Sequence, residues 1–133
     1  MSRNPARPLS PHLSVYKWGP HMLVSILHRI TGAGLATVGA AALVWWLAAA
    51  ASGPDAYQDF TGWAASWLGI VVGVGLSWAF FQHLLSGLRH LVMDIGAGFE
   101  IERNKFWATM TLAGSILLTA ALWLYIVLVR NAA

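Results

Sequence analysis

Residues 63–91, WAASWLGIVVGVGLSWAFFQHLLSGLRHL, decide the fold of this chain. Most of the stretch holds almost no polar side chain. A helix of this length, rising about 1.5 Å per residue, crosses the roughly 30 Å of hydrocarbon in a bilayer. The stretch ends on His83, Arg89 and His90, and Asp94 follows shortly after. Because polar and charged side chains are costly inside a membrane, we expect these residues to mark a site.

The composition of the whole chain is that of a membrane protein. Of its 133 residues, 58% are hydrophobic and 10% are charged, with a mean hydropathy of +0.63, whereas an ordinary soluble domain has about 25% charged residues. The polar residues are too few to cover a globule, so membrane lipid must surround it. The chain has no cysteine, so a metal or redox group must rely on histidine or on a partner. The high isoelectric point of about 9.8 reflects membrane topology, and we expect no nucleic acid partner.

We therefore predict an all-α membrane protein with three transmembrane helices. The spans lie at about residues 22–51, 63–91 and 106–129, in a transmembrane domain of residues 22–133 that follows an N-terminal arm of residues 1–21. The segment SGPDAYQDF between the first two spans has the residues of a turn-rich, acidic loop. Glycines that can end a helix and charges that stay in water lie between the second and third spans. Four glycines are expected to allow close helix packing: Gly32, Gly34, Gly73 and Gly75.

Lysine and arginine residues predict the orientation of the chain. Basic residues precede the first span and lie between the second and third spans, whereas the first loop has none. By the positive-inside rule, the N-terminal arm faces the cytoplasm or matrix. The first residues lack the apolar core of a secretory signal and do not resemble a transit peptide. This favours a multi-pass protein of the bacterial inner (plasma) membrane over the mitochondrial inner membrane.

Two polar stripes are expected to meet at the inner membrane surface. Ser25 and Arg29 share one stripe of the first span, and His28 lies about 60° to one side. His83, with His90 seven residues later, lies on one stripe of the second span. Since neighbouring antiparallel helices bring these ends to the same depth, the two stripes form a candidate site.

His83 is the most deeply placed of these histidines, and an imidazole at that depth needs a partner. Imidazole suits haem iron, and a haem edge fits beside Gly87, where the missing side chain leaves a flat gap. The alternative to haem binding is that His83 only makes a hydrogen bond to a neighbouring helix. Two histidines seven residues apart on one helix cannot bind opposite faces of one haem, so a second ligand must come from elsewhere. Three other histidines of the chain are expected to lie too shallow to supply this ligand: His12, His21 and His28. The second ligand is therefore expected from a partner subunit.

The hydroxyl of Ser25 and the guanidinium of Arg29 can together bind a carbonyl or a carboxylate. Quinone oxygens and haem propionates are both such acceptors. The alternative is that Arg29 binds no ligand and only extends its side chain to the lipid headgroups. Trp18, just before the first span, fits an interfacial anchor. Arg89 and Asp94 can be a surface charge pair at the end of their helix.

Three motifs in order resemble the cytochrome b membrane-anchor subunit of succinate dehydrogenase (complex II). They are RPLSPHLSVY at residues 7–16, SILHRITG at residues 25–32 and HLLSGLRHLVMDIG at residues 83–96. In that family the last motif reads His-x-x-x-Gly-x-Arg-His-x-x-x-Asp, and this chain completes it. The resemblance covers essentially the whole chain.

The resemblance implies a three-helix bundle that a second small anchor subunit completes. The two anchors share one haem b and hold the peripheral iron–sulfur and flavoprotein subunits, and the assembly passes electrons from succinate to its substrate ubiquinone. The chain alone is then a non-catalytic subunit of an enzyme complex. The arm of residues 1–21 would lie on the inner face against the iron–sulfur subunit.

The resemblance also implies a role for each site residue. His83 matches the axial ligand of the haem iron, and the partner anchor supplies the second ligand. Ser25 and Arg29 match residues that line the ubiquinone pocket, and Trp18 corresponds to a further contact there. Two histidines are placed on the side of the haem propionates: His28 and His90.

Two other classes of protein remain as alternatives. A small proton-coupled transporter would use His83, His90 and Asp94 as a relay and would need no iron. A purely structural anchor would bind neither haem nor quinone.

Overall fold

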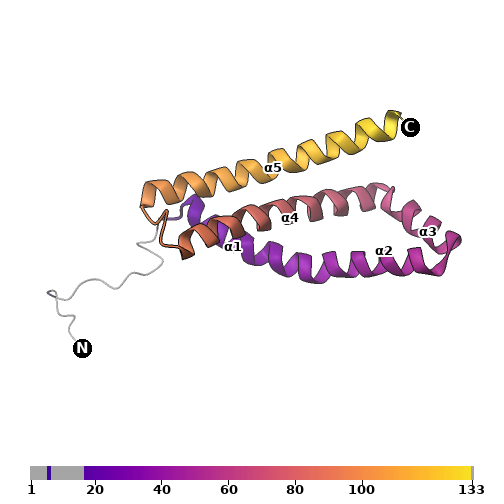
Figure 1. Cartoon of the computed structure of the whole chain (residues 1–133), viewed down its shortest axis with the longest axis horizontal. Coiled ribbons are helices and arrows are strands. Elements are labelled where there is room, and N and C mark those ends of the chain that lie inside the picture. Colours follow the sequence, from indigo (N-terminus) through magenta and orange to yellow (C-terminus); the bar gives the residue numbers. More distant parts are fainter. Residues whose placement is uncertain (1–5, 7–16, 133) are drawn as a thin grey trace.

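The computed structural model describes residue 6 and residues 17–132, and this part of the chain is helical without strands. Figure 1 shows long helices that run side by side. The elements in order are α1 (Pro20–Gly34), the π-helical turn η2 (Leu35–Gly39), α2 (Ala40–Ser52), α3 (Pro54–Ala64), α4 (Trp67–Asp94) and α5 (Ile101–Ala132).

Three helical segments are long and apolar enough to cross a membrane: Pro20–Ser52, Trp67–Asp94 and Ile101–Asn131. The predicted all-α fold with three transmembrane helices is confirmed, and the chain is an integral membrane protein. The helices extend beyond the predicted spans at several ends because a helix satisfies its own backbone hydrogen bonds and can continue past the hydrocarbon. Most of the predicted arm, residues 1–21, lies outside the described residues.

The predicted loop between the first two spans is wrong, because this segment is mostly helix α3. Gly53, with φ of 113°, makes the turn between α2 and α3. Pro54 then begins the helix, where its fixed φ is favourable and its missing N–H costs nothing, and Asp55 lies in the first turn. The Gly-Pro signal here marks the start of a helix, with its acidic residue at the favourable end of the helix dipole.

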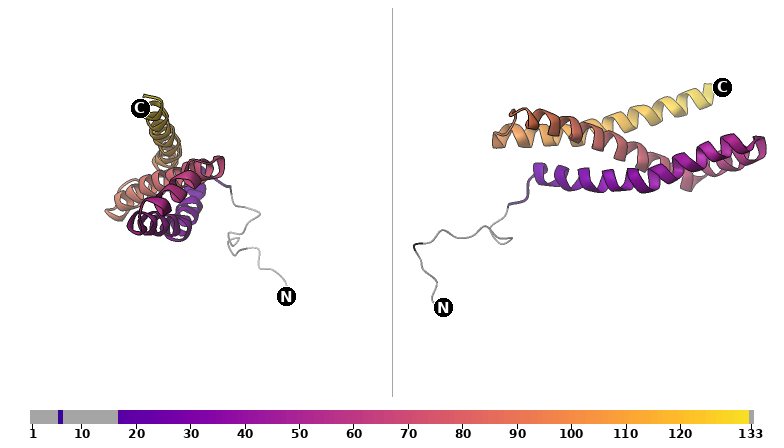
Figure 2. Two further views of the ribbon diagram at one scale, coloured as in Figure 1. Left: turned by 90° about the vertical axis from the view of Figure 1, so that its right-hand side faces the viewer. Right: turned by 60° about the horizontal axis from the view of Figure 1, so that its bottom comes forward.

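Helix α4 packs against both α1 and α5, and α5 also contacts α1. The start of α1, the end of α4 and the start of α5 gather at one end of the bundle, and α3 lies at the other (Figures 1 and 2). We call the first of these the polar end. The arrangement brings the polar residues of the first and second spans together, as predicted.

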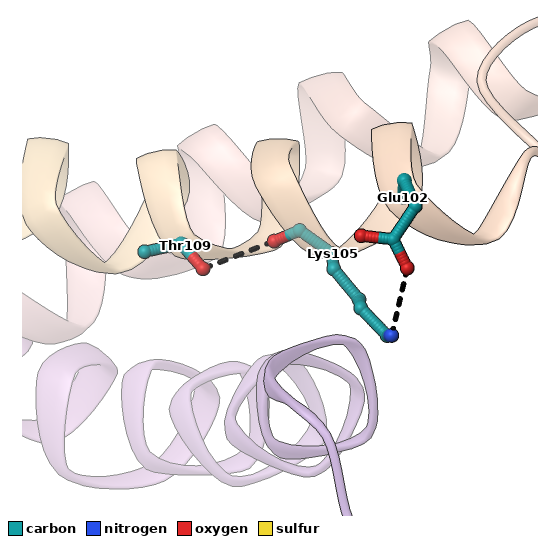
Figure 3. Close-up of polar contacts among 3 residues, drawn as sticks. All are labelled: Glu102, Lys105 and Thr109. Atoms are coloured by element: carbon teal, nitrogen blue, oxygen red, sulfur yellow. Dashed lines mark hydrogen bonds and ion pairs between the residues drawn. The ribbon is translucent and has the colours of Figure 1, made fainter.

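Charged residues at the start of α5 stay on the outside of the polar end. Lys105 pairs with Glu102 at 3.0 Å, and the Lys105 carbonyl accepts a hydrogen bond from Thr109 at 3.0 Å (Figure 3). Arg103 pairs with Glu100 at 3.3 Å. All of these pairs are exposed and contribute little to stability. That this connection stays in water remains a prediction.

A line of small and polar side chains joins α4 to α5. Gln82 and Ser115 are fully buried, and the Ser115 hydroxyl donates to the Gln82 Oε1 at 2.8 Å. The Trp123 indole N–H donates to the Ser77 hydroxyl at 3.3 Å, and its ring lies where a Cβ on Gly73 would be only 3.0 Å away. Because lipid offers apolar contacts as good as those between helices, such polar bonds and close approaches hold the helices together.

Two of the four glycines predicted to allow close packing meet a neighbouring side chain. A Cβ at Gly32 would collide with the His83 ring and one at Gly73 would press tightly on the Trp123 ring, whereas Gly34 and Gly75 have nothing within 4 Å. The prediction is therefore confirmed for Gly32 and Gly73 alone within the described chain.

Ser115→Ala should destabilise the fold by about 1–2 kcal/mol, because it leaves the buried Gln82 Oε1 without its donor. Thr119→Val is the matched control, since that hydroxyl donates only to the Ser115 carbonyl of its own helix. The measurement is the resistance of the purified assembly to a denaturing detergent. Equal losses in the two variants would show that the bond between α4 and α5 does not stabilise the fold.

Candidate functional site

Three histidines meet at the polar end between α1 and α4, and we call them the histidine cluster: His28, His83 and His90. The rings of His28 and His83 stack with their centroids 4.0 Å apart and their planes 8° from parallel. The His90 ring meets His28 edge-on, with centroids 5.1 Å apart. Because His28 comes from α1 and the other two come from α4, the cluster depends on the packing of these helices.

The Nδ1 atom of His83 binds the neighbouring helix. It lies 3.1 Å from the backbone carbonyl oxygen of His28. A carbonyl only accepts, so Nδ1 must carry the proton. Nδ1 also lies 3.3 Å from the Thr31 hydroxyl, which gives its own hydrogen to the Leu27 carbonyl at 2.7 Å and therefore accepts from His83. In the neutral ring, these contacts place the proton on Nδ1 and leave the lone pair on Nε2.

His28 binds α4 in the same way. Its Nδ1 lies 2.7 Å from the Ser86 hydroxyl, which is fully buried and gives its own hydrogen to the Gln82 carbonyl at 2.6 Å. Ser86 therefore accepts from His28. Each of the two stacked histidines thus donates from Nδ1 to the other's helix. Neither Nε2 atom has a hydrogen-bond partner in the described part of the chain.

Glycines lie against both stacked rings. A Cβ on Gly32 would lie 2.8 Å from Cε1 of His83, so this ring rests directly on the α1 backbone. A Cβ on Gly87 would lie 3.7 Å from Cε1 of His28, which is an ordinary contact. The predicted flat gap at Gly87 therefore faces His28, and the glycine in contact with the His83 ring is Gly32.

The expectation that His28 is too shallow to reach His83 is wrong. Helix α1 begins at Pro20, and His28 lies more than two turns inside it, although the continuous apolar sequence starts only at Ile30. The stacking still prevents the two histidines from binding one iron from opposite faces, because parallel rings 4.0 Å apart leave no room for a metal between them. The expected need for a ligand from elsewhere therefore remains.

The residues predicted to contact quinone lie on α1 or just before it, and none belongs to the histidine cluster. Ser25 is half-buried and Arg29 is exposed, and neither side chain makes a hydrogen bond or ion pair with another described residue. Trp18, before α1, is 64% exposed. The polar groups of Ser25 and Arg29 are therefore available to a ligand or a partner.

Arg89 and Asp94 do not form the predicted charge pair. Arg89 Nη2 donates instead to the Asn104 Oδ1 at 2.6 Å and so joins α4 to the start of α5. Arg89 also lines an apolar cavity of about 360 Å³ between α4 and α5, away from the histidine cluster. Asp94 is exposed and makes no side-chain contact with His83 or His90 in the described chain, so these three residues do not form a connected relay.

The sequence reasoning missed Thr31, gave Ser86 no role and expected Gly32 only to allow close helix packing. Ser86 lies beside the predicted stripe of α4, and Thr31 and Gly32 follow His28 within one turn of α1. These residues could have been found from their helical spacing relative to the histidines, because residues three and four apart lie on one face of a helix. The missing information was which face of α1 meets α4.

The described residues hold no group of three or more histidine, cysteine or acidic side chains that could bind a bare metal ion. A metal already held in a macrocycle needs one axial imidazole from a chain. The chemistry of His83, with its Nδ1 proton fixed and its Nε2 lone pair available, fits that requirement.

Comparison with known proteins identifies the family of the chain. The sequence model of the family described as "Succinate dehydrogenase/Fumarate reductase transmembrane subunit" matches residues 3–122. The chain is 44% identical over 112 residues to the succinate dehydrogenase cytochrome b556 subunit of Paracoccus denitrificans, covering 84% of this chain and 85% of the relative.

More distant relatives have the same kind of name. The cytochrome b556 subunit of Rickettsia felis is 40% identical over 88% of this chain and 90% of its own length. The cytochrome b560 subunit of Reclinomonas americana is 35% identical over 93% of this chain and 89% of its own length. The chain therefore belongs to the succinate dehydrogenase cytochrome b family, the non-catalytic membrane anchors of that enzyme complex, as its three motifs predicted.

Proposed function

We propose that His83 binds the iron of one haem b through Nε2 and that this chain helps to form the site where ubiquinone is reduced. The observation that carries the proposal is the hydrogen bond from His83 Nδ1 to the His28 carbonyl at 3.1 Å. A ligating histidine characteristically donates its other ring N–H to a carbonyl or carboxylate, which fixes the tautomer and strengthens the ligand. The haem, when bound, accepts and returns single electrons.

The second axial ligand comes from a partner anchor subunit in this proposal. The stacked rings exclude His28 as the opposite ligand, and His90 lies on the same helix as His83. The haem is then shared between two chains. This explains why so much apolar surface of the three helices remains exposed in the isolated chain, although lipid accounts for part of that surface.

Ser25 and Arg29 bind the head of ubiquinone. The Ser25 hydroxyl donates to a quinone carbonyl, and the Arg29 guanidinium stabilises negative charge that develops as the ring takes up two electrons and two protons to become ubiquinol. Trp18 provides an apolar wall beside them. The support is their common stripe on α1 and the absence of any side-chain partner for Ser25 and Arg29 in the described chain.

His28 and His90 face the propionates of the haem. Because Ser86 takes the Nδ1 proton of His28, this ring donates to a carboxylate only as an imidazolium. The His90 side chain has no hydrogen bond with another described residue, so a neutral His90 can adopt the tautomer that donates. Arg29, next to His28 in sequence, can serve the same carboxylates.

In this proposal the site lies at the cytoplasmic surface of a bacterial inner membrane. Lys17 lies just before α1, and Arg103 and Lys105 lie near the start of α5, so all three belong to the polar end, as the positive-inside rule requires of a cytoplasmic surface. In this proposal the iron–sulfur subunit binds on the same side and in turn holds the flavoprotein subunit. The arm of residues 1–21, most of which lies outside the described residues, is expected to contact the iron–sulfur subunit. Electrons from succinate therefore arrive at the end of the bundle that holds the quinone residues.

His83→Ala should remove most of the haem from the purified complex, because it deletes the iron ligand on this chain. His90→Ala is the matched variant on the same face of α4 and should retain most of it. The ratio of haem to flavin and the Soret band of the complex measure the outcome. Equal loss in the two variants would contradict the assignment of His83.

Ser25→Ala should lower succinate-driven ubiquinone reduction about 10- to 100-fold, because one hydrogen bond to a charged or developing anion contributes about 1.5–3 kcal/mol. Arg29→Ala should lower it about 100-fold, as removal of an oxyanion donor does. Ser25→Ala should retain haem, and both variants should still reduce a dye that takes electrons from the peripheral subunits. Ser52→Ala, at the far end of the first span, is the control, because its hydroxyl donates only to Ala48 of its own helix. Unchanged ubiquinone reduction in both variants would exclude these residues from the quinone site.

A further inference from the structure

We propose that α1 carries a built seat for the His83 imidazole, in which Thr31 and Gly32 are positioning residues for the haem ligand. The seat has three parts: the Gly32 backbone, the Thr31 hydroxyl and the His28 carbonyl. The inference rests on the proposed role of His83 as the iron ligand. It adds that the orientation of this ligand, which belongs to α4, is set by the helix packed beside it.

Gly32 provides the floor of the seat. A Cβ at this position would lie 2.8 Å from Cε1 of His83, 3.3 Å from Nδ1 and 3.8 Å from Nε2. Since Cε1 lies between the two nitrogens, the ring cannot move away from such a Cβ without displacing both of them. One of these nitrogens donates to the His28 carbonyl, and the other carries the lone pair for iron. A methyl group at position 32 therefore disturbs both the nitrogen that donates the hydrogen bond and the nitrogen that binds iron.

Thr31 provides a second acceptor for the same N–H. Its side chain is 3% exposed, and its hydroxyl lies 3.3 Å from Nδ1 while its hydrogen is used on the Leu27 carbonyl. The His83 N–H is thus shared between this hydroxyl and the His28 carbonyl, which hold the ring from two directions. A second acceptor also increases the electron donation of the imidazole to a bound metal.

The seat makes ligand geometry depend on the packing of α1 against α4. All three parts lie on the stretch from His28 to Gly32, which is a single turn of α1. In the described chain no residue of α4 makes a hydrogen bond to the His83 ring. A shift of α1 along α4 therefore changes the orientation of the His83 ring.

The test at Thr31 uses two variants in the complete assembled complex. Thr31→Val removes the hydroxyl at nearly constant shape, whereas Thr31→Ser keeps it. The valine variant should shift the haem midpoint potential upward and move the low-spin g values of the ferric haem, because the ligand donates less to iron. The serine variant should restore both values. Equal g values and potential in the valine variant and the wild type would overturn the role of Thr31.

The test at Gly32 uses a neighbouring glycine as its control. Gly32→Ala should lower the ratio of haem to flavin by about 10-fold, as loss of ligand support does at metal sites, and should displace the g values of the remaining haem. Gly34→Ala should change neither quantity, because a Cβ there meets nothing within 4 Å. Wild-type haem content and g values in Gly32→Ala would overturn the seat.

The His83→Ala variant separates this inference from the function on which it rests. If that variant keeps its haem, His83 is not the ligand and the proposed function fails. If it loses haem while Gly32→Ala and Thr31→Val both match the wild type, His83 is the ligand and only the seat is overturned.

Discussion

The hydrogen bond between His83 Nδ1 and the His28 carbonyl is the interaction on which the rest of the site depends. It joins α4 to α1 at the polar end, fixes the proton on Nδ1 and leaves the Nε2 lone pair available. A helical carbonyl so deep in α1 already accepts from its own helix, and its second lone pair makes this additional bond possible. In an apolar bundle such a bond holds the ring in one orientation, because the ring has few polar alternatives.

A second bond repeats this arrangement in the opposite direction. His28, on α1, donates to Ser86 of α4, so two histidines with parallel rings each hold the other's helix. Away from this end, Gln82 and Ser115 join α4 to α5, and the Trp123 ring packs against Gly73. Helix α4 is therefore the centre of the chain, with polar bonds to both neighbours. Its histidines can present a stable site although few side chains are buried in the isolated chain.

Much of the fold follows from the sequence alone. Hydropathy and length determine the number of spans, and the polar residues at the ends of the first and second spans determine which ends meet. The segment from Pro54 to Ala64 could not be predicted by the same reasoning. Its Gly-Pro pair and acidic residues are as typical of a loop as of the first turn of a helix, and only the structure distinguishes them.

The candidate site was predictable in its residues and less so in its contacts. The spacing of His83, Gly87 and His90 identifies one face of α4, but the depth of His28 depends on where α1 begins. That start is set by Pro20, ahead of the apolar run. Gly32 could not be distinguished from Gly34 in the sequence, because only the rotation of α1 about its axis decides which glycine meets a ring.

A structure of the complete assembly with its haem, at a resolution that shows imidazole orientation, tests the central claim most directly. We predict iron on Nε2 of His83, Nδ1 still donating to the His28 carbonyl, and the opposite ligand in another chain. Haem held by a different residue of this chain, or a His83 ring in contact with only lipid or side chains, would contradict the account.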